Sequence, residues 1–251
     1  STINKLIVED NPDIRIYLSQ SLSPHYTIQE APDGKQALAM AKENPPDLII
    51  SDIAMPEMNG LDFCKAIKTT LETSHIPVIL LTARTSLIFK INGFETGADD
   101  YVTKPFQMSL LEVRIKNLLQ TRANLRARFS EGGYELTPSQ IAVGSLDEKF
   151  LKEVILLVEK HMDNPEFNVE YLGNEMGMSR MQLYRKIKAL TGESPLQAIR
   201  SIRLKRAAQL LKSKQFTVAE VTYQVGFQDL KYFRERFKKE YGVSPSEFAD
   251  Q

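Results

Sequence analysis

Short apolar runs alternate with helix-period segments over the first half of the chain. The runs, at 5–8, 48–51, 78–81 and 101–103, are rich in Ile, Val and Leu and predict strands buried on both faces. Between them lie amphipathic segments such as 34–43, with Ala37, Leu38 and Ala41 inward, and 60–69, with Leu61, Cys64, Ile67 and Lys68 on one stripe. This alternation predicts a doubly wound parallel α/β sheet.

Polar side chains directly follow each of these runs. They are Glu9 with Asp10, Asp52, Thr82 and Lys104. Because parallel strands end at one edge of the sheet, we expect these groups to meet in a crevice there. A carboxylate needs a divalent cation to approach an anionic phosphoryl group, and Asp10, Asp52 and a backbone carbonyl would hold Mg²⁺, with Glu9 acting through water. The set predicts phosphoryl transfer onto Asp52.

Each of these groups also has a simpler interpretation. Asn11, Pro12 and Asp13 are typical of a helix start, so Glu9 and Asp10 alone would be weak evidence for a metal site. Thr82 and Lys104, taken singly, are ordinary surface residues. It is their occurrence together, in strand order, that favours the phosphoryl site.

The second half of the chain carries helix-period patterns throughout. We expect two helix-turn-helix units, at 169–190 and 217–241, joined by a long basic helix at 195–211. Their second helices would enter successive major-groove segments about 34 Å apart. The side chains predicted to face DNA are Arg180, Met181, Tyr184, Arg185 and Lys188 in the first unit, and Lys231, Tyr232, Glu235 and Arg236 in the second.

Charge divides the chain in the same way. Residues 1–120 carry 11 Lys and Arg against 15 Asp and Glu, whereas 180–239 carry 15 against 4. Such a basic block is typical of a protein that binds a polyanion. A charged face on one helix is usually only solvated, so the DNA-binding prediction depends on the duplicated unit together with this charge.

A helical extension and a linker are expected at 121–146, between domains at 1–120 and 147–251. The helix pattern continues past residue 121 and gives way after Ser130 to turn residues that include Gly132, Gly133 and Pro138. The chain of 251 residues contains one cysteine, no signal peptide and no apolar stretch that could span a bilayer, so we expect a cytoplasmic location. Its start at Ser1 suggests a piece of a larger parent protein.

The sequences LIVEDNP (6–12), SDIAMPEMNG (51–60), LTAR (81–84) and GADDYVTKPF (97–106) resemble the receiver domain of bacterial response regulators. The resemblance implies a flavodoxin-like fold with a five-stranded parallel sheet. It implies that Asp52 accepts a phosphoryl group from a histidine kinase and that Ala54 gives Mg²⁺ its backbone carbonyl. It also implies a cis peptide bond at Lys104–Pro105 and a switch in which Tyr101 turns inward when Thr82 engages the phosphoryl group.

The sequences at 176–195 and 218–245 resemble the AraC-type DNA-binding domain. This chain departs from that pattern at Thr222, where alanine is usual, and at Leu230 with Lys231, where Pro and Ser are frequent. Glu235 would either accept from a cytosine amino group or avoid the phosphates. The readout by the second unit is therefore less well defined than that by the first.

A receiver followed by an AraC-type domain is similar to the cytoplasmic end of hybrid two-component proteins, many of which control genes for glycan use. A stand-alone regulator remains an alternative, and in either case we expect a homodimer on activation and no membrane contact by this segment. Two other classes of function stay open. One is a phosphohydrolase, although Ala54 occupies the place of the second acid that dehalogenase-like enzymes use; the other is an interaction module that works without phosphorylation.

Overall fold

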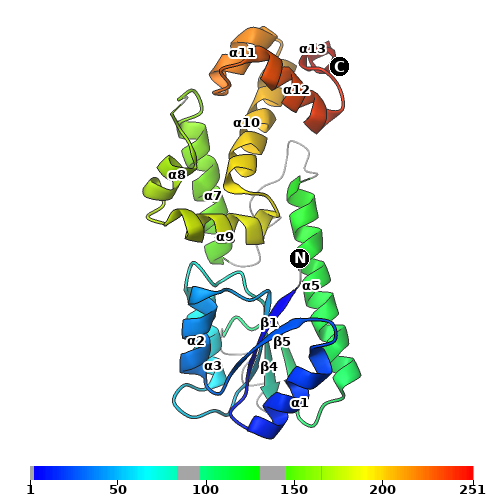
Figure 1. Ribbon diagram of the computed structural model, residues 1–251. Coiled ribbons are helices and arrows are strands. Elements are labelled where there is room, and N and C mark those ends of the chain that lie inside the picture. Colours follow the sequence, from blue (N-terminus) through cyan, green and yellow to red (C-terminus); the bar gives the residue numbers. More distant parts are fainter. Residues whose placement is uncertain (1–2, 84–95, 131–144, 165, 251) are drawn as a thin grey trace. The chain divides into compact units, whose positions relative to one another are not determined.

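The chain forms two compact units, Ser1–Asn124 and Leu125–Gln251, in a computed structural model that describes residues 3–83, 96–130, 145–164 and 166–250 (Figure 1). Most of the predicted linker, at 131–144, and Arg84 of the receiver-like motif lie outside the described residues. None of the helices in the described ranges combines the length and the hydropathy that crossing a membrane requires.

The first unit is built on a five-stranded parallel sheet with the strand order β2-β1-β3-β4-β5. The strands are β1 Asn4–Val8, β2 Thr27–Ala31, β3 Leu48–Asp52, β4 Val78–Thr82 and β5 Asp100–Thr103. All four strands predicted from apolar runs are confirmed. The fifth, β2, is an edge strand with the sequence TIQEA and only one fully buried residue, so its pattern carries no apolar run. The flavodoxin-like class is thereby confirmed.

Among the residues that the structure describes, two helices pack on each face of this sheet (Figure 1). The helices are α1 Pro12–Leu22, α2 Gly34–Glu43, α3 Gly60–Thr69 and α5 Met108–Ser130. Leu6 and Val8 of β1 pack with α2 and α3, whereas Ile7 packs with α1 and α5. Alternate residues of each strand therefore supply opposite layers of the core, as expected for a sheet buried on both sides.

Lys5 is the unusual member of this core. Its side chain is fully buried, its ammonium has no hydrogen-bond partner, and it lies 2.7 Å from the centroid of the Tyr26 ring. Burial lowers the pKa of Lys5 from 10.5 to about 7, against the charge of Glu112, while Lys116 lowers it further. Below pH 10.5 the unfolded chain gains this proton before the folded chain does, so stability falls as the pH drops to about 7.

Lys5→Met is therefore expected to raise the free energy of unfolding at pH 7 by about 2 kcal/mol, because it removes a buried amine that makes no hydrogen bond. It should also flatten the pH dependence of stability between pH 7 and 10. Urea unfolding of the chain across this pH range measures both effects. Lys35→Met, at an exposed position of α2, is the control and should change neither. A destabilised Lys5→Met variant would contradict the expectation.

The second unit contains only helices among its described residues. They are α7 Ser145–Lys160, α8 Val169–Glu175, α9 Arg180–Thr191, α10 Pro195–Lys212, α11 Val218–Gln224, α12 Leu230–Tyr241 and α13 Pro245–Asp250. The predicted helix-turn-helix units correspond to α8 with α9 and to α11 with α12. Ser179 and Thr217 form capping boxes at the starts of α9 and α11, and Asp229 caps α12. The last helix, α13, was not predicted.

Arg203 of α10 joins the segment between α7 and α8 to the turn of the second helix-turn-helix unit. Its guanidinium donates to the carbonyl of Asn164, after α7, and to that of Gly226, in the turn between α11 and α12, each at 3.3 Å. Gly226 has a φ of +79°, and a Cβ there would come within 2.2 Å of the Met162 carbonyl oxygen. The glycine is thus required both by its backbone conformation and by a close chain contact.

Candidate phosphoacceptor site and DNA-facing helices

The carboxyl ends of β1, β3, β4 and β5 bring the predicted polar groups to one edge of the sheet. The parallel register pairs Asp52 with Leu81, and Thr82 with Thr103, so each functional side chain lies at the end of its own strand. Asp52 and Thr82 are 7% and 2% exposed. Glu9 is 1% exposed, whereas Asp10 beside it is open to solvent. This edge includes the position where strand order reverses, between β1 and β3, which is where open α/β sheets bind ligands.

Lys104 joins the acidic groups of this edge. Its ammonium lies 2.7 Å from a Glu9 oxygen and 3.0 Å from a carboxylate oxygen of Asp52. Burial by itself would lower the pKa of Lys104, but the hydrogen bonds from Lys104 to Glu9 and Asp52, and their charges, outweigh this effect and raise it. Burial, with the charge of Asp52, raises the pKa of Glu9 although Lys104 opposes the shift. The ammonium therefore remains charged and holds the two carboxylates in place.

The simpler interpretation of the acid pair is also partly correct. The Asn11 side chain caps α1 by accepting from the backbone N–H groups of Asp13 and Ile14, at 2.9 and 3.2 Å. The hydrogen bond that Glu9 accepts from the backbone N–H of Asn11 is long, at 3.3 Å. Asn11 therefore does the capping, and neither Glu9 nor Asp10 serves as the cap of α1.

The residues at this edge fit a divalent cation. Oxygen atoms of Glu9, Asp10 and Asp52 lie within 4.8 Å of one another. We call the site formed by Glu9, Asp10, Asp52, Thr82 and Lys104 the acidic notch. It holds three carboxylates and one ammonium, which pairs with Glu9 and Asp52, so it keeps negative charge. An all-oxygen donor set is the kind that Mg²⁺ prefers. Ala54, predicted to contribute its carbonyl, lies in the exposed loop two residues after Asp52. Receiver domains bind Mg²⁺ through such acidic residues; the assignment to this notch remains a proposal.

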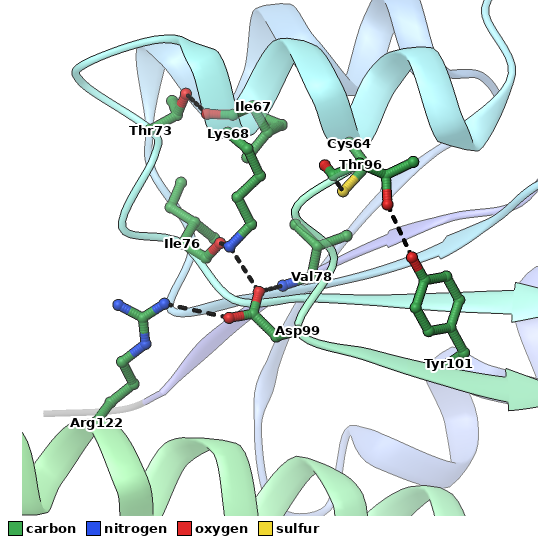
Figure 2. Close-up of polar contacts among 10 residues, drawn as sticks. All are labelled: Cys64, Ile67, Lys68, Thr73, Ile76, Val78, Thr96, Asp99, Tyr101 and Arg122. Carbon is green, nitrogen blue, oxygen red and sulfur yellow. Dashed lines mark hydrogen bonds and ion pairs between the residues drawn. The ribbon is translucent and has the colours of Figure 1, made fainter. Parts of the chain in front are cut away.

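Tyr101 lies partly buried on β5. Its hydroxyl shares a hydrogen bond of 2.8 Å with the Thr96 hydroxyl (Figure 2). Burial raises the pKa of Tyr101, so the phenol stays protonated at neutral pH. Cys64 of α3 contacts the Thr96 carbonyl at 3.5 Å in the same view. The ring is therefore already packed against the α2 and α3 side of the core.

Asp99 anchors the amino-terminal edge of β4 and β5, opposite the acidic notch (Figure 2). Its carboxylate accepts from Lys68 of α3 at 2.6 Å and from the Val78 backbone at 2.8 Å. The Arg122 guanidinium of α5 lies 3.5 Å from its other oxygen. These contacts fix β5 between α3 and α5, and thereby the strand that carries Tyr101 and leads to Lys104. The peptide bond at Lys104–Pro105 is cis, as expected.

The side chains predicted to face DNA lie on the outer sides of α9 and α12. Leu183, Ile187 and Leu190 form the inner stripe of α9, and Phe233 and Phe237 that of α12. The predicted residues are exposed at Arg180, Met181, Tyr184, Lys188, Lys231, Tyr232 and Glu235, and half-buried at Arg185 and Arg236. The Lys188 ammonium donates to the Gly192 carbonyl at the end of α9.

Contacts within the domain also order the outer face of α12. Tyr232 is covered by the guanidinium of Arg236, 4.9 Å from its ring, and a hydrogen bond from Arg200 lowers the pKa of its phenol. Thr222, unusual for its position, is buried with its hydroxyl donating to the Val218 carbonyl at 2.7 Å. That bond gives the buried hydroxyl a partner inside α11, so threonine in place of alanine is accommodated without disrupting the second helix-turn-helix unit.

Lys186 is a residue that the sequence patterns missed. It is one of the 15 basic residues at 180–239 that predict a DNA-binding surface. The residue is nevertheless 1% exposed, and its ammonium is paired with Asp147 of α7. Asp147 precedes the basic block by many residues, so no local spacing connects the two.

An acidic notch on a doubly wound sheet and two basic helix-turn-helix units define a transcriptional regulator controlled by phosphorylation. Residues 6–116 match the family described as response regulator receiver domain, and residues 172–251 match a helix-turn-helix domain.

The curated relatives include a protein named as a histidine kinase and one named as a response regulator. Histidine kinase P4 of Formosa agariphila is 46% identical over 246 residues, which is 98% of this chain and 18% of that protein. Response regulator MprA of Mycobacterium bovis is 30% identical over 171 residues, 65% of this chain and 74% of that regulator. A solved putative response regulator from Chloroflexus aurantiacus has 35% identity over 48% of this chain and 99% of its own, with a TM-score of 0.45. The chain belongs to the response regulator family, with an AraC-type helix-turn-helix domain.

Proposed function

We propose that Asp52 is the phosphoacceptor of this chain and that its phosphorylation controls operator binding by α9 and α12. The observation that carries the proposal is the ion pair of Lys104 with both Glu9 and Asp52 at the end of three parallel strands. The family match supports a receiver rather than a phosphohydrolase, whose second acid has no counterpart at Ala54.

Phosphoryl transfer at this notch needs little covalent machinery from the protein. A carboxylate oxygen of Asp52 would attack phosphorus, the P–N bond of a donor phosphohistidine would break, and the imidazole would leave with the bonding electrons. Mg²⁺ held by Glu9, Asp10, Asp52 and the Ala54 carbonyl would supply positive charge that reduces repulsion between the carboxylate and the phosphoryl oxygens. Lys104, just after β5, would balance the negative charge of Asp52.

The response to phosphorylation would begin at Thr82 and Tyr101. Thr82 ends β4 beside the notch, and in this proposal its hydroxyl would donate to a new phosphoryl oxygen. Displacement of Thr82 toward the phosphoryl group would change the space next to Tyr101, and thereby the balance between two states of the receiver. We propose that one of these states favours the homodimer that binds DNA.

The proposed phosphoryl donor is a histidine kinase domain. The likeness to a protein named histidine kinase P4, which extends over 98% of this chain, supports a donor in the same parent polypeptide. The chain spans only 18% of that protein, so the kinase activity and any membrane anchor of a parent are likewise proposals. Control of glycan-utilisation genes also stays a prediction.

Operator binding with and without a phosphate mimic tests the function. Purified chain with Mg²⁺ and beryllofluoride should bind a duplex selected from a randomised library more tightly than it does with Mg²⁺ alone. Asp52→Asn should remove this difference. Equal affinity in the two conditions, with beryllofluoride bound at Asp52, would support an interaction module in which phosphorylation does not control DNA binding.

Arg185→Ala is expected to weaken binding to the selected duplex by about 1–3 kcal/mol, because in this proposal Arg185, on the second helix of the first helix-turn-helix unit, contacts base edges. Fluorescence anisotropy against the selected and a scrambled duplex measures the effect. Lys149→Ala serves as the control, because it removes a cation of α7, which lies in the second compact unit but outside both helix-turn-helix units. An equal loss on both duplexes, with a smaller salt slope, would reassign Arg185 to phosphate contact.

A further inference from the structure

The pair formed by Asp147 and Lys186 is the most deeply buried ion pair among the described residues. The two side chains are 1% and 0% exposed, and Lys186 donates directly to Asp147. The ammonium also lies 5.8 Å from the ring centroid of Phe150, which is buried on α7. The pair thus joins the first turn of α7 to the middle of α9.

Stability alone does not explain a fully buried ion pair. The cost of removing two charges from water usually equals or exceeds their attraction, and apolar side chains of similar shape are often as stable or more so. An ion pair differs from apolar contacts in being directional, because the ammonium must point at a carboxylate oxygen. Such a contact adds a directional restraint on the rotation of α9 about its axis to the apolar packing of Leu183, Ile187 and Leu190.

Lys186 lies beside the predicted DNA-reading residues in the sequence but on the opposite side of α9. Arg185 is its neighbour, and Tyr184 and Lys188 are exposed. A site that reads bases must hold its side chains within about 10–20° of the productive orientation. Rotation of α9 about its axis would move Tyr184, Arg185 and Lys188 together.

We propose that the Asp147–Lys186 pair is a positioning device that sets the orientation of α9 for sequence-specific DNA recognition. The inference rests on the proposed function, since it assumes that α9 reads DNA. Lys186 itself does not contact DNA in this proposal. The pair acts through α9 and therefore affects the discrimination between sequences more than the general attraction to DNA.

A charge-neutral double variant separates positioning from stability. Asp147→Leu with Lys186→Met keeps nearly the shapes of both side chains and leaves the net charge unchanged. Non-specific affinity and its salt dependence should then be preserved, because they follow the phosphate contacts. Specific binding is measured, at a temperature where the full chain is folded by circular dichroism, against a duplex that the wild-type chain selected from a randomised library.

The expected result is a ratio of scrambled-duplex Kd to selected-duplex Kd that falls at least tenfold, with a melting temperature at or above that of the wild type. A ratio within twofold of the wild type would overturn the proposal, whatever the melting temperature. The matched control is Glu148→Leu with Lys152→Met, which removes an exposed ion pair of α7 and should leave the ratio unchanged. An equal loss in that control would also overturn the proposal.

Lys186→Arg provides an independent measurement if the double variant does not fold. It keeps the charge pair but places the donors differently, so the ratio should fall at least threefold. An unchanged ratio in a folded Lys186→Arg chain would count against the proposal. Failure of the wild-type chain to select any sequence would instead remove the proposed function, so the two failures are distinguishable.

Discussion

Replacing Asp52 with asparagine is expected to reduce labelling of the chain by acetyl phosphate to background. The amide keeps the size of the side chain but lacks the carboxylate oxygen that attacks phosphorus. Lys104 would keep its contact with Glu9, at 2.7 Å, so the notch should stay folded. Labelling is carried out in the presence of Mg²⁺ and measured by intact-mass spectrometry. The wild type should gain the mass of a phosphoryl group, held as an acyl phosphate, and Asp52→Asn should not.

The control for this variant is Asp13→Asn. Asp13 lies in the first turn of α1, close to the notch in sequence, but it is exposed and belongs to no cluster that could hold a metal among the described residues. Its variant should label as the wild type does. Persistent labelling of Asp52→Asn would move the phosphoacceptor to another acid, and Asp10 would be the first to examine.

Gly60→Ala is expected to destabilise the receiver by about 3 kcal/mol and to abolish phosphorylation as well. A Cβ at Gly60 would lie 2.0 Å from the Asp52 carbonyl oxygen and 2.9 Å from the Cα of Ile53. Both are backbone atoms, so relief requires the end of β3 to move. Gly60 also donates to the Ile53 carbonyl at 2.9 Å, a contact that draws the start of α3 against the loop carrying the phosphoacceptor.

Asn59→Ala is the matched control at the same helix end. Asn59 accepts from the N–H groups of Leu61 and Asp62, and loss of such a cap costs about 1 kcal/mol without any collision. Calorimetric unfolding of both variants, together with acetyl phosphate labelling, compares the two effects. A Gly60→Ala variant that is no less stable than Asn59→Ala would show that the backbone after Asp52 adapts easily.

The acidic notch could be predicted largely from local sequence. Each strand that leads to it is an apolar run, and Asp52, Thr82 and Lys104 stand at the ends of their runs. A parallel sheet then brings those ends together whatever the details of packing. The helix caps Ser179 and Asp229 were also predictable, because a cap depends on residues only three positions away.

Phe63 and β2 show where pattern reading falls short. Phe63 is fully buried on α3, although the predicted stripe ran through Leu61 and Lys68. Strand β2 carries mainly polar residues and is defined by its pairing with β1 rather than by its own hydrophobicity. All five residues of β2 pair with β1, so this edge strand forms although it has no apolar run of its own.

The sequence by itself determined the strand and helix periods, the order of the functional groups and the basic charge of the second half. Tertiary structure alone decided which charged groups lose solvent and which partners they find. Lys186 meets Asp147 across 39 residues. Unlike the contact of Lys104 with Glu9, which the ends of parallel strands predict, this pair follows from no period or motif, because its burial and charge pairing depend on how α7 packs against α9.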